Sequence, residues 1–545
     1  MRVVFLGMGA EQLPVELLSA ILKQHGHEVG LVFDGSLFDD QYHLQMPRLA
    51  RLFRLEDKLA DEAAALRPDV IAMSVLTNTY QWGLRMASAI KARTGAKVIF
   101  GGVHPSAVPD TVIAEPCVDA ICIGEGDAAF PAYLRALEEE ALDVPIANIW
   151  HKRSDGSVVK GVQSGFMQDL DSLPFPDKEL YANDIHIRDC YLTMTGRGCP
   201  YRCTFCFNSF WAKLPSRSGD KGGKYVRQRS VANVIEELRQ AKRRWNMRHV
   251  DFEDDVFTVD KEWVRQFSEE YRSEIGLPFK CLTHPKYVDE DIVRWLQEAG
   301  CTWVQIGIQS IDDHYKYKQM KRYETVGDVA WAIDAFKKAG IAVKGDHIFG
   351  NPGEPPESQE VARLFYADHT PQRVDTFWLT YLPGLEMTDD ALARGELTAA
   401  EVERLAQGEV GFFQTVERNI PAAELRRLEN FAHLFKMLPA IPARLRQRVK
   451  AEWLAPVPRS VLTAVSTAVD IATALAQRNP EFPNFARYYR RQMRRSVQRR
   501  LGLLRPPELQ RGATAETAAP EPLLNVKPAA ASLARLRTGN AAASS

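Results

Sequence analysis

Two long stretches of this chain alternate short apolar runs with amphipathic helical patterns, and this alternation limits the fold more than any other feature. The first stretch covers residues 1–145 and the second covers residues 188–395. Strands that alternate with helices are typical of α/β domains built on a parallel sheet. The chain has 545 residues. Since one hydrophobic core does not normally organise so long a chain, we expect several domains.

Residues 1–145 contain five apolar runs that read as buried parallel strands. A strand that is covered on both faces of a sheet is apolar almost throughout, and these runs have that composition. We therefore predict a doubly wound sheet of five strands, Rossmann-like and flavodoxin-like. Ligands of such sheets bind beyond the carboxyl ends of the strands. The runs are residues 3–6, 28–33, 70–75, 97–100 and 120–123.

The turns that follow three of these runs carry residues suited to contact with a ligand. Adjacent glycines let a ligand approach the backbone closely, and a hydroxyl group can hydrogen-bond to a polar ligand. Each turn alone would also suit a fold that binds nothing, and a single histidine is more often a satisfied loop residue than a ligand. The candidates are Ser74 and Leu76 after the third run, Gly101, Gly102 and His104 after the fourth, and Gly124, Glu125 and Gly126 after the fifth.

Residues 199–206, Cys-Pro-Tyr-Arg-Cys-Thr-Phe-Cys, place three thiols close together in the second stretch. A structural zinc site would need a second pair of Cys or His at similar spacing, and none follows nearby. A disulfide framework belongs to short secreted chains, and the remaining cysteines of this long chain are scattered. Thiolates hold iron–sulfur clusters, normally four to a [4Fe–4S] centre. Three thiolates, from Cys199, Cys203 and Cys206, would leave one iron free to bind a substrate or cofactor.

Six strand-like runs in the second stretch predict an open, partial (β/α)6 barrel that is TIM-like, with its site at the carboxyl ends of the strands. Two acidic residues, Asp254 and Asp255, follow the second run and can hold an ammonium group. Gln309 and Ser310 end the fourth run and can bind ribose hydroxyls. For each residue alone, capping a helix or forming a turn is the commoner role. The runs lie near residues 191–195, 249–252, 279–283, 303–307, 341–348 and 375–379.

Together, the cysteine spacing and these strand-end residues closely resemble the radical S-adenosylmethionine superfamily, over about residues 188–390. The resemblance implies that Cys199, Cys203 and Cys206 bind three irons of a [4Fe–4S] cluster and that S-adenosylmethionine binds the fourth. An electron from the cluster would then cleave the sulfonium to give a 5′-deoxyadenosyl radical. The resemblance also implies that the cofactor contacts include Phe205, Asp254 or Asp255, Gln309 and Ser310.

The first stretch is similar to the cobalamin-binding domain of methyltransferases and mutases, over about 140 residues. The similarity rests on Ser-x-Leu after the third run and Gly-Gly after the fourth, and it implies that the turn residues named above contact cobalamin. One departure is clear, because residues 7–12 read Gly-Met-Gly-Ala-Glu-Gln and lack the D-x-H-x-x-G element. No histidine from this turn would therefore bind the cobalt. The same omission is usual in cobalamin domains fused in front of radical S-adenosylmethionine enzymes.

The remaining segments have less regular patterns. Residues 146–187 are polar and contain prolines, which predicts an interdomain linker. Residues 396–505 are mainly helical in pattern, and residues 506–545, rich in Ala, Pro and Thr, predict a disordered tail. Within the helical region, residues 487–500 form a strongly basic helix. A solvated face is its commonest explanation, and peripheral contact with an anionic membrane is the alternative.

The combined resemblance predicts a cobalamin-dependent enzyme that methylates an unactivated carbon by means of a 5′-deoxyadenosyl radical and methylcobalamin. The alternatives are a cyclase or oxidoreductase that uses the same cofactors without methyl transfer, and a non-catalytic sensor. The substrate, a small molecule or a peptide, is not specified by the sequence, and an external electron donor such as flavodoxin or ferredoxin is expected. A net charge of -1 argues against a general nucleic-acid binder. Without a signal-like or membrane-spanning run, we expect a cytoplasmic protein.

Overall fold

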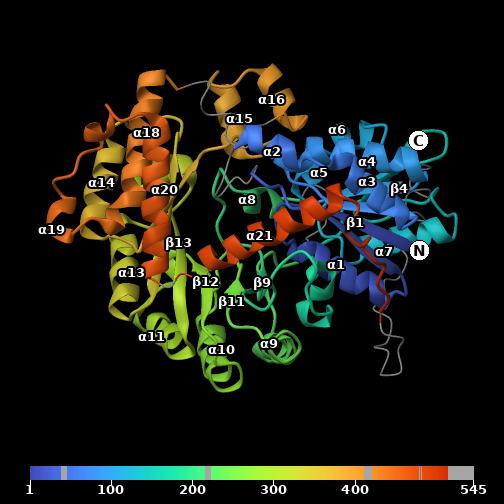
Figure 1. Ribbon diagram of the computed structural model, residues 1–545, viewed down its shortest axis with the longest axis horizontal. Helices are drawn as coiled ribbons and strands as arrows, with labels where there is room; N and C mark the ends of the chain where they lie inside the picture. The colour runs from blue at the N-terminus through green and yellow to red at the C-terminus, as the bar shows by residue number, and fades with distance from the viewer. Residues whose placement is uncertain (39–45, 215–222, 410–419, 478, 480, 513–545) are drawn as a thin grey trace, which may run out of the picture. The chain divides into compact units, whose positions relative to one another are not determined.

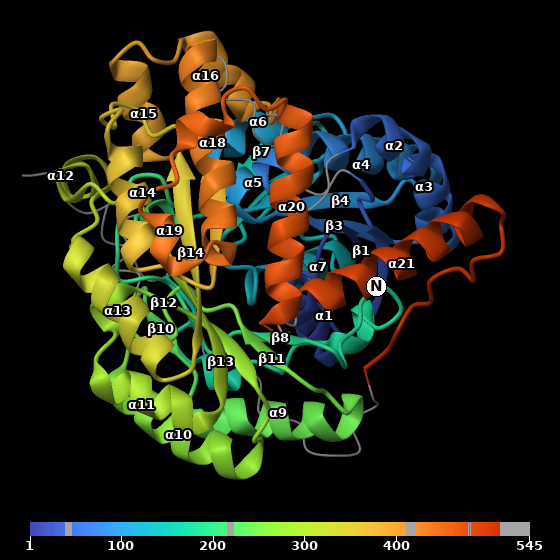
Figure 2. The ribbon, with the colours of Figure 1, turned by 60° about the vertical axis from the view of Figure 1, so that its left-hand side comes forward.

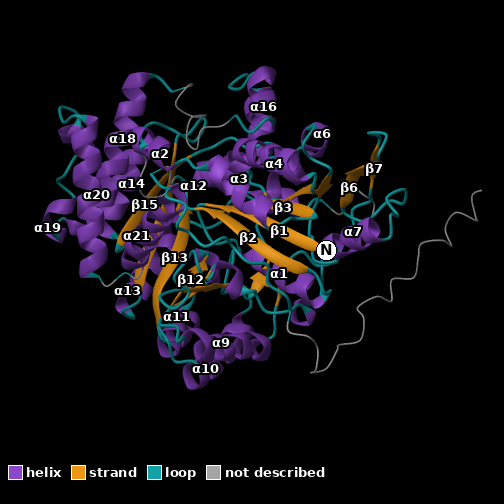
Figure 3. Cartoon of the chain, turned by 45° about the vertical axis from the view of Figure 1, so that its right-hand side comes forward, coloured by secondary structure: helices purple, strands orange, loops and turns teal. Residues whose placement is uncertain are grey.

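The computed structural model describes residues 1–38, 46–214, 223–409, 420–477, 479 and 481–512 (Figure 1). Residues 1–511 form one unit that contains two large sheets with helices around them. A mainly helical region follows the second sheet (Figure 3). The α/β class and the order of its parts are therefore as predicted from the sequence.

Five parallel strands begin the first sheet, at the positions of the five apolar runs. They are β1 (Arg2–Met8), β2 (Glu28–Asp34), β3 (Val70–Ser74), β4 (Lys97–Gly101) and β5 (Ala120–Cys122). Their order in the sheet is β2-β1-β3-β4-β5, so the direction of winding reverses between β1 and β3. Ligands of doubly wound sheets bind at the carboxyl side of such a reversal.

Helices cover both faces of this sheet, which explains why its strands are apolar almost throughout. Alternate residues of β1 face opposite sides of the sheet. Val3 and Phe5 pack with α1 (Leu13–Gln24) and α7 (Ala129–Glu138). Val4 and Leu6 pack instead in a second cluster. The helices of that second face are α3 (Glu56–Ala65), α4 (Tyr80–Thr94) and α6 (Pro109–Ala114).

The prediction of an interdomain linker at residues 146–187 is wrong for the first part of that segment. Strands β6 (Ile149–Lys152) and β7 (Val158–Lys160) continue the first sheet beyond β5 as an antiparallel hairpin, so this sheet has seven strands. Alternate residues of β6 are buried, as on a strand with one covered face. Later in the segment, the fully buried Tyr181 packs edge-on against Phe33, with ring centroids 5.8 Å apart. The segment is therefore part of the packed protein.

Six parallel strands form the second sheet, in the order β15-β14-β13-β12-β11-β8, as expected for the partial barrel (Figure 2). Four helices of this region begin at a side chain that accepts a hydrogen bond from the first turn, which stabilises a helix start. These caps are Ser230, Asp260, Asp289 and Thr325. The strands are β8 (Tyr191–Thr193), β11 (Val250–Phe252), β12 (Phe279–Thr283), β13 (Cys301–Gln309), β14 (Ala342–Phe349) and β15 (Arg373–Trp378). The helices are α9 (Val231–Trp245), α10 (Lys261–Glu274), α11 (Glu290–Ala299), α13 (Val326–Lys338) and α14 (Ser358–Asp368).

Beyond the second sheet the described chain is helical, as predicted. In the described part of the chain, α20 is the one helix with the length and composition of a membrane span, a test that helices of soluble proteins also pass. The helices are α15 (Glu386–Ala393), α16 (Ala399–Ala406), α18 (Ala422–Met437), α19 (Ala443–Arg446), α20 (Arg459–Ala476) and α21 (Glu481–Arg500).

The disordered tail predicted from residue 506 does not begin there. Gln510 pairs antiparallel with Val29 at the free edge of β2, and its side chain accepts a 2.7 Å hydrogen bond from Lys23. Backbone pairing with an exposed sheet edge is a common way to hold a chain end. Residues 513–545 of the predicted tail lie outside the described residues.

The basic helix α21 lies across the side of both large sheets (Figures 1 and 2) and has side-chain contacts with residues of both. At its start, Glu481 forms ion pairs with Lys280, Lys344 and Arg373 of the second sheet, at 3.3, 3.4 and 2.9 Å. Further along, the Tyr488 hydroxyl donates to the carbonyl oxygen of Gly9 at 2.8 Å, in the turn after β1.

Three arginines of α21 also bind residues of the first half of the chain. Arg495 and Arg499 form ion pairs with Asp184 and Glu62, at 2.9 and 2.8 Å, and Arg491 donates to the carbonyl oxygen of Ala182 at 3.2 Å. The basic pattern thus serves packing between segments far apart in the sequence. This use favours a structural role over membrane contact.

We expect Arg495→Gln to destabilise the protein, because Asp184 would remain buried without its ion-pair partner. The loss of one partner of a buried pair costs about 3–5 kcal/mol of unfolding free energy. Arg494→Gln is the matched control, since Arg494 is exposed one position away. Urea unfolding of the two variants measures the difference. Equal midpoints for both variants would contradict a stabilising role for the Arg495–Asp184 pair.

Candidate functional site

The loop of residues 199–206 follows β9 (Gly196–Arg197), which pairs antiparallel with β10 (Arg227–Gln228), and it leads into α8 (Phe207–Trp211). Its centre is anchored by Thr204. The Thr204 amide donates to the Met320 carbonyl oxygen at 3.2 Å, its hydroxyl donates to Gln319 O at 2.7 Å, and its own carbonyl accepts from the Met387 amide at 3.1 Å. These bonds fix the loop between two neighbouring segments of the barrel.

Burial raises the pKa of each of the three thiols of this loop. It raises the pKa of Cys199 to about 12 and that of Cys203 to about 11, and it also raises the pKa of Cys206. The free thiols are therefore protonated at neutral pH, and iron must displace their protons in order to bind. No three His, Cys, Asp or Glu side chains of the described residues surround a single metal ion. Thiolates that hold a cluster each bind a different iron, so a cluster does not require the three thiols to meet at one ion.

The two acidic candidates after β11 have different surroundings. The buried Asp254 accepts hydrogen bonds from the Thr195 amide at 3.0 Å and from the Thr195 hydroxyl at 2.8 Å, and burial raises its pKa to about 6. Through these hydrogen bonds, Asp254 holds the backbone in place just after β8. Asp255 faces a cavity and accepts a 2.8 Å hydrogen bond from the Asn208 amide. Of the two, Asp255 is the one placed to contact a ligand.

The backbone is irregular at the end of β13, where the candidates Gln309 and Ser310 lie. Gln309 has φ +65°, which is uncommon for a residue with a side chain, and the register with β14 shifts there. The Ser310 hydroxyl donates to Glu354 at 2.5 Å, and burial raises the pKa of Glu354 to about 7. Phe205 packs in an apolar cluster with Met320 instead of lining the cavity. Neither Gln309 nor Ser310 is among the residues that line this cavity, and Ser310 already has an internal partner.

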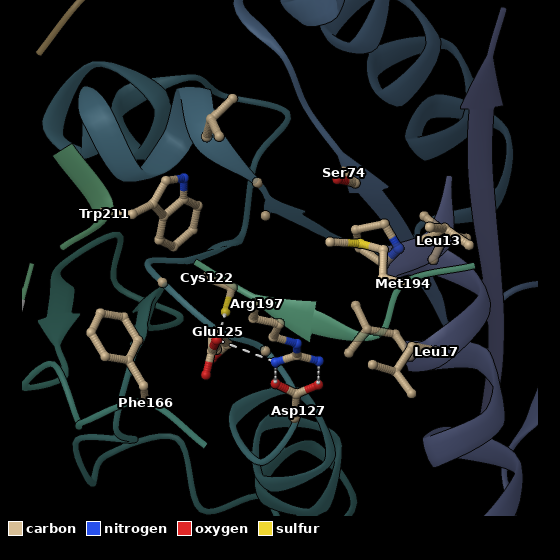
Figure 4. Close-up of a pocket in the computed structure, with 18 of the residues that line it drawn as sticks. Leu13, Leu17, Ser74, Cys122, Glu125, Asp127, Phe166, Met194, Arg197 and Trp211 are labelled. Carbon is tan, nitrogen blue, oxygen red and sulfur yellow. Dashed lines mark hydrogen bonds and ion pairs between the residues drawn. The ribbon is translucent and has the colours of Figure 1, made fainter. Parts of the chain in front are cut away.

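One cavity of about 520 Å³ lies between the carboxyl ends of the two sheets (Figure 4). This volume is in the range of small-molecule sites. A side chain at Gly102, where φ is +99°, would lie 2.9 Å from the backbone of Val75, so this turn requires glycine. From the first sheet the lining includes Ser74, Leu76, Gly101, Gly102, Gly124, Glu125 and Gly126. From the second region it includes Arg197, Cys206, Asn208, Trp211, Tyr225 and Asp255.

His104 was expected to contact the ligand, and the structure contradicts this expectation. His104 lies in the first turn of α5 (Val103–Ala107), and its side chain is fully buried away from the cavity lining. Its Nδ1 lies 3.1 Å from the Thr77 hydroxyl, and its ring packs against Tyr80 with centroids 4.3 Å apart. Burial lowers its pKa to about 4. It is a packing residue.

Sequence reasoning missed the ion pairs that join the two halves of the cavity. Arg197, two residues before Cys199, makes two hydrogen bonds to Asp127, at 2.7 and 2.9 Å, and lies 3.2 Å from Glu125. Arg227 lies 2.9 Å from Glu125 as well. The only sequence signal was an arginine between two glycines, directly before the cysteine loop.

The cavity suits a broad, mainly apolar ligand beside the first sheet. Leu13 and Leu17 of α1 reach it below Ser74, as Figure 4 shows. The segment taken for a linker contributes Phe166 and Pro174. No histidine is among the described residues that line the cavity, in agreement with the missing D-x-H-x-x-G element. These residues fit a corrin ring that receives no histidine from the first turn.

Comparison with known proteins identifies two domains, which correspond to the two large sheets. The B12 binding domain model matches residues 6–134, and the radical SAM superfamily model matches residues 193–365. An uncharacterised methyltransferase of Pyrococcus horikoshii is 25% identical to this chain, over 68% of this chain and 80% of its own length. An anaerobic magnesium-protoporphyrin IX monomethyl ester cyclase of Rubrivivax gelatinosus is 22% identical, over 60% of this chain and 59% of its own length.

A solved structure shares the fold of both parts. It is that of the cobalamin-dependent S-adenosylmethionine radical enzyme OxsB with aqua-cobalamin and S-adenosylmethionine bound. The match has a TM-score of 0.61 and 14% identity, and it covers 92% of this chain and 80% of that chain. The predicted arrangement of a cobalamin-binding domain before a radical S-adenosylmethionine barrel is therefore confirmed.

Proposed function

We propose that this chain, which belongs to the radical S-adenosylmethionine enzymes with a cobalamin-binding domain, is a methyltransferase that acts on an unactivated carbon. The observation that carries the proposal is the single cavity, which reaches both the Gly101-Gly102 turn and Cys206. Two cofactors held at these places would face the same space. The similarity to the methyltransferase of Pyrococcus horikoshii supports methyl transfer as the outcome.

The bound cofactors would supply a carbon radical and a transferable methyl group, and the protein would hold the two cofactors in position. Cys199, Cys203 and Cys206 would hold three irons, and Asp255 lies where it can hold the ammonium group of S-adenosylmethionine. Arg197 ties the cysteine loop to the turn that ends β5. Apolar side chains of α1 line the floor of the cavity and keep water from the reacting atoms.

Radical chemistry with an iron–sulfur cluster also bears on the electron donor, the substrate and the cellular compartment of the enzyme. Radical S-adenosylmethionine enzymes need an electron from outside, and we propose a flavodoxin or a ferredoxin as the donor. The substrate is a small molecule or a peptide, whose carbon would have to reach the cavity beside Cys206 and Asp255. A reducing, cytoplasmic setting would protect an oxygen-sensitive cluster.

Ring closure without methyl transfer is the second candidate, because the cyclase of Rubrivivax gelatinosus is also similar to this chain. The two functions differ in the fate of the S-adenosylmethionine methyl group. A methyltransferase passes that group to its product, and a cyclase does not.

The first test is reconstitution of the anaerobic protein with iron, sulfide and hydroxocobalamin. The proposal predicts one cluster and one corrinoid retained per chain, and release of 5′-deoxyadenosine when S-adenosylmethionine and titanium(III) citrate are added. A protein that binds the cluster but retains no corrinoid would refute cobalamin-dependent methylation.

A further inference from the structure

A short segment beside the cysteine loop has two exposed aromatic side chains that no packing explains. The π-helix η6 (Lys316–Met320) follows α12 (Asp313–Tyr315), and π-helices are often found at functional sites. Tyr317 and Tyr323 are 57% and 52% exposed, and their rings meet edge-on with centroids 5.5 Å apart. Exposed aromatic side chains that gather at one place are typical of protein-binding surfaces.

This segment packs directly on the cysteine loop. The carbonyl oxygens of Gln319 and Met320 accept the two hydrogen bonds from Thr204, which lies between Cys203 and Cys206. The exposed Lys318 is the residue before Gln319. A protein that docks on the segment would thus be separated from the cluster thiols by a single hydrogen-bonded layer.

Two other sides of the cysteine loop are covered. On one side Tyr201 stacks on His284, with ring centroids 4.0 Å apart. On another side Cys206 faces the cavity, which the first sheet also lines. The π-helix side of the loop is exposed, since Tyr317 is 57% exposed.

The charge around the two tyrosines is mainly positive. Lys318 lies 5.6 Å from the Tyr317 ring centroid, and Lys321 follows the π-helix. Lys213 lies nearby, because both Lys321 and Lys213 pair with Glu386. Lys213 and Lys321 thus share one carboxylate, Lys318 adds a third positive charge, and an acidic partner would complement this excess positive charge. We define the Tyr–Lys surface as Tyr317, Lys318, Lys321 and Tyr323.

We propose that the Tyr–Lys surface docks a small acidic protein that donates one electron, with a flavin or iron–sulfur centre near its acidic face. The donor loses one electron and the cluster gains it, and no bond or proton needs to move in this step. The inference rests on the proposed function, since it requires a cluster at the three cysteines. Aromatic contacts would provide the affinity, and the lysines would steer the encounter.

The test compares two electron sources for the reconstituted holoenzyme, with 5′-deoxyadenosine as the measured product. One source is reduced flavodoxin, and the other is titanium(III) citrate, which needs no docking surface. We expect Lys318→Glu and the double change Tyr317→Ser with Tyr323→Ser to lower the flavodoxin-driven rate about tenfold. The titanium-driven rate should not change. Added salt should slow the unmodified enzyme with flavodoxin more than it slows Lys318→Glu.

Trp453→Ser is the matched control, because Trp453 is 60% exposed and belongs to the C-terminal helical region. Its flavodoxin-driven rate should equal that of the unmodified enzyme. Unchanged flavodoxin-driven rates in the Tyr–Lys variants would overturn the docking proposal, and so would equal losses with both electron sources. A surface that instead joins two copies of the chain would show as a dimer by sedimentation that Lys318→Glu dissociates. No product from the unmodified enzyme with titanium(III) citrate would refute the proposed function itself.

Discussion

Cys203→Ala is expected to abolish formation of 5′-deoxyadenosine, with a rate loss of about 1,000-fold or more, because no other described group can take the place of the lost iron ligand. Cys203 is the central thiol of the loop and is only 8% exposed. Its loss would leave two thiolates for a cluster that needs at least three from the protein. Iron analysis, the visible absorption of the cluster and chromatography of the nucleoside product measure the effect together.

Cys190→Ala is the control for this change. Cys190 precedes β8, beside Asp251 and Lys280 at the amino ends of the barrel strands. The cysteine loop lies beyond the opposite ends. The control variant should therefore keep its cluster and its rate. Cluster loss in both variants would mean that general instability, and not ligation, explains the result for Cys203.

Arg197→Gln is expected to have the second largest effect, because Arg197 joins the cysteine loop to the turn that ends β5. The change would leave Asp127, which is 8% exposed, without its two hydrogen bonds from the guanidinium. Truncating one partner of a buried pair costs about 3–5 kcal/mol. We expect the cluster to remain and cobalamin to bind about 100-fold more weakly, because that turn would no longer be fixed against the loop. Absorbance titration with hydroxocobalamin measures the affinity.

Two further variants separate positioning from stability. Asp127→Asn added to Arg197→Gln removes the unpaired buried charge, so stability should recover while cobalamin affinity stays low. Lys91→Gln is the matched control, since Lys91 pairs with Asp119 at 2.6 Å in the same domain, away from the cavity lining. Weak cobalamin binding in Lys91→Gln, or full affinity in the double variant, would contradict a positioning role for Arg197.

The first sheet could be predicted because its strands are buried on both faces and are apolar almost throughout. The second sheet could be predicted because its strand-like runs alternate with amphipathic helical patterns. The β6–β7 hairpin could not be predicted in the same way, because Ile149–Lys152 alternates buried and half-buried residues over only four positions. A short antiparallel hairpin at a sheet edge leaves a weak pattern. The cysteine spacing was the strongest local signal, since it needs no distant partner.

Residues whose role depends on a distant partner could not be assigned from the sequence. Arg197 and Asp127 are 70 positions apart and meet only when the two domains pack together. The arginines of α21 have acidic partners on separate elements, so their pattern resembled that of a solvated or membrane-bound helix. His104 was misassigned because it lies two positions after Gly102, and the sequence does not show that its ring packs against Tyr80.

The measurement that tests the central claim most directly follows the methyl group of S-adenosylmethionine. The reconstituted enzyme is incubated with S-adenosylmethionine that carries a trideuterated methyl group, a reductant and the metabolites of a strain that lacks this gene. Mass spectrometry then compares the metabolites before and after the reaction. The account predicts a cobalamin-dependent product in which one trideuteromethyl group replaces one hydrogen. A product that forms with release of 5′-deoxyadenosine but carries no deuterated methyl group would contradict methyl transfer.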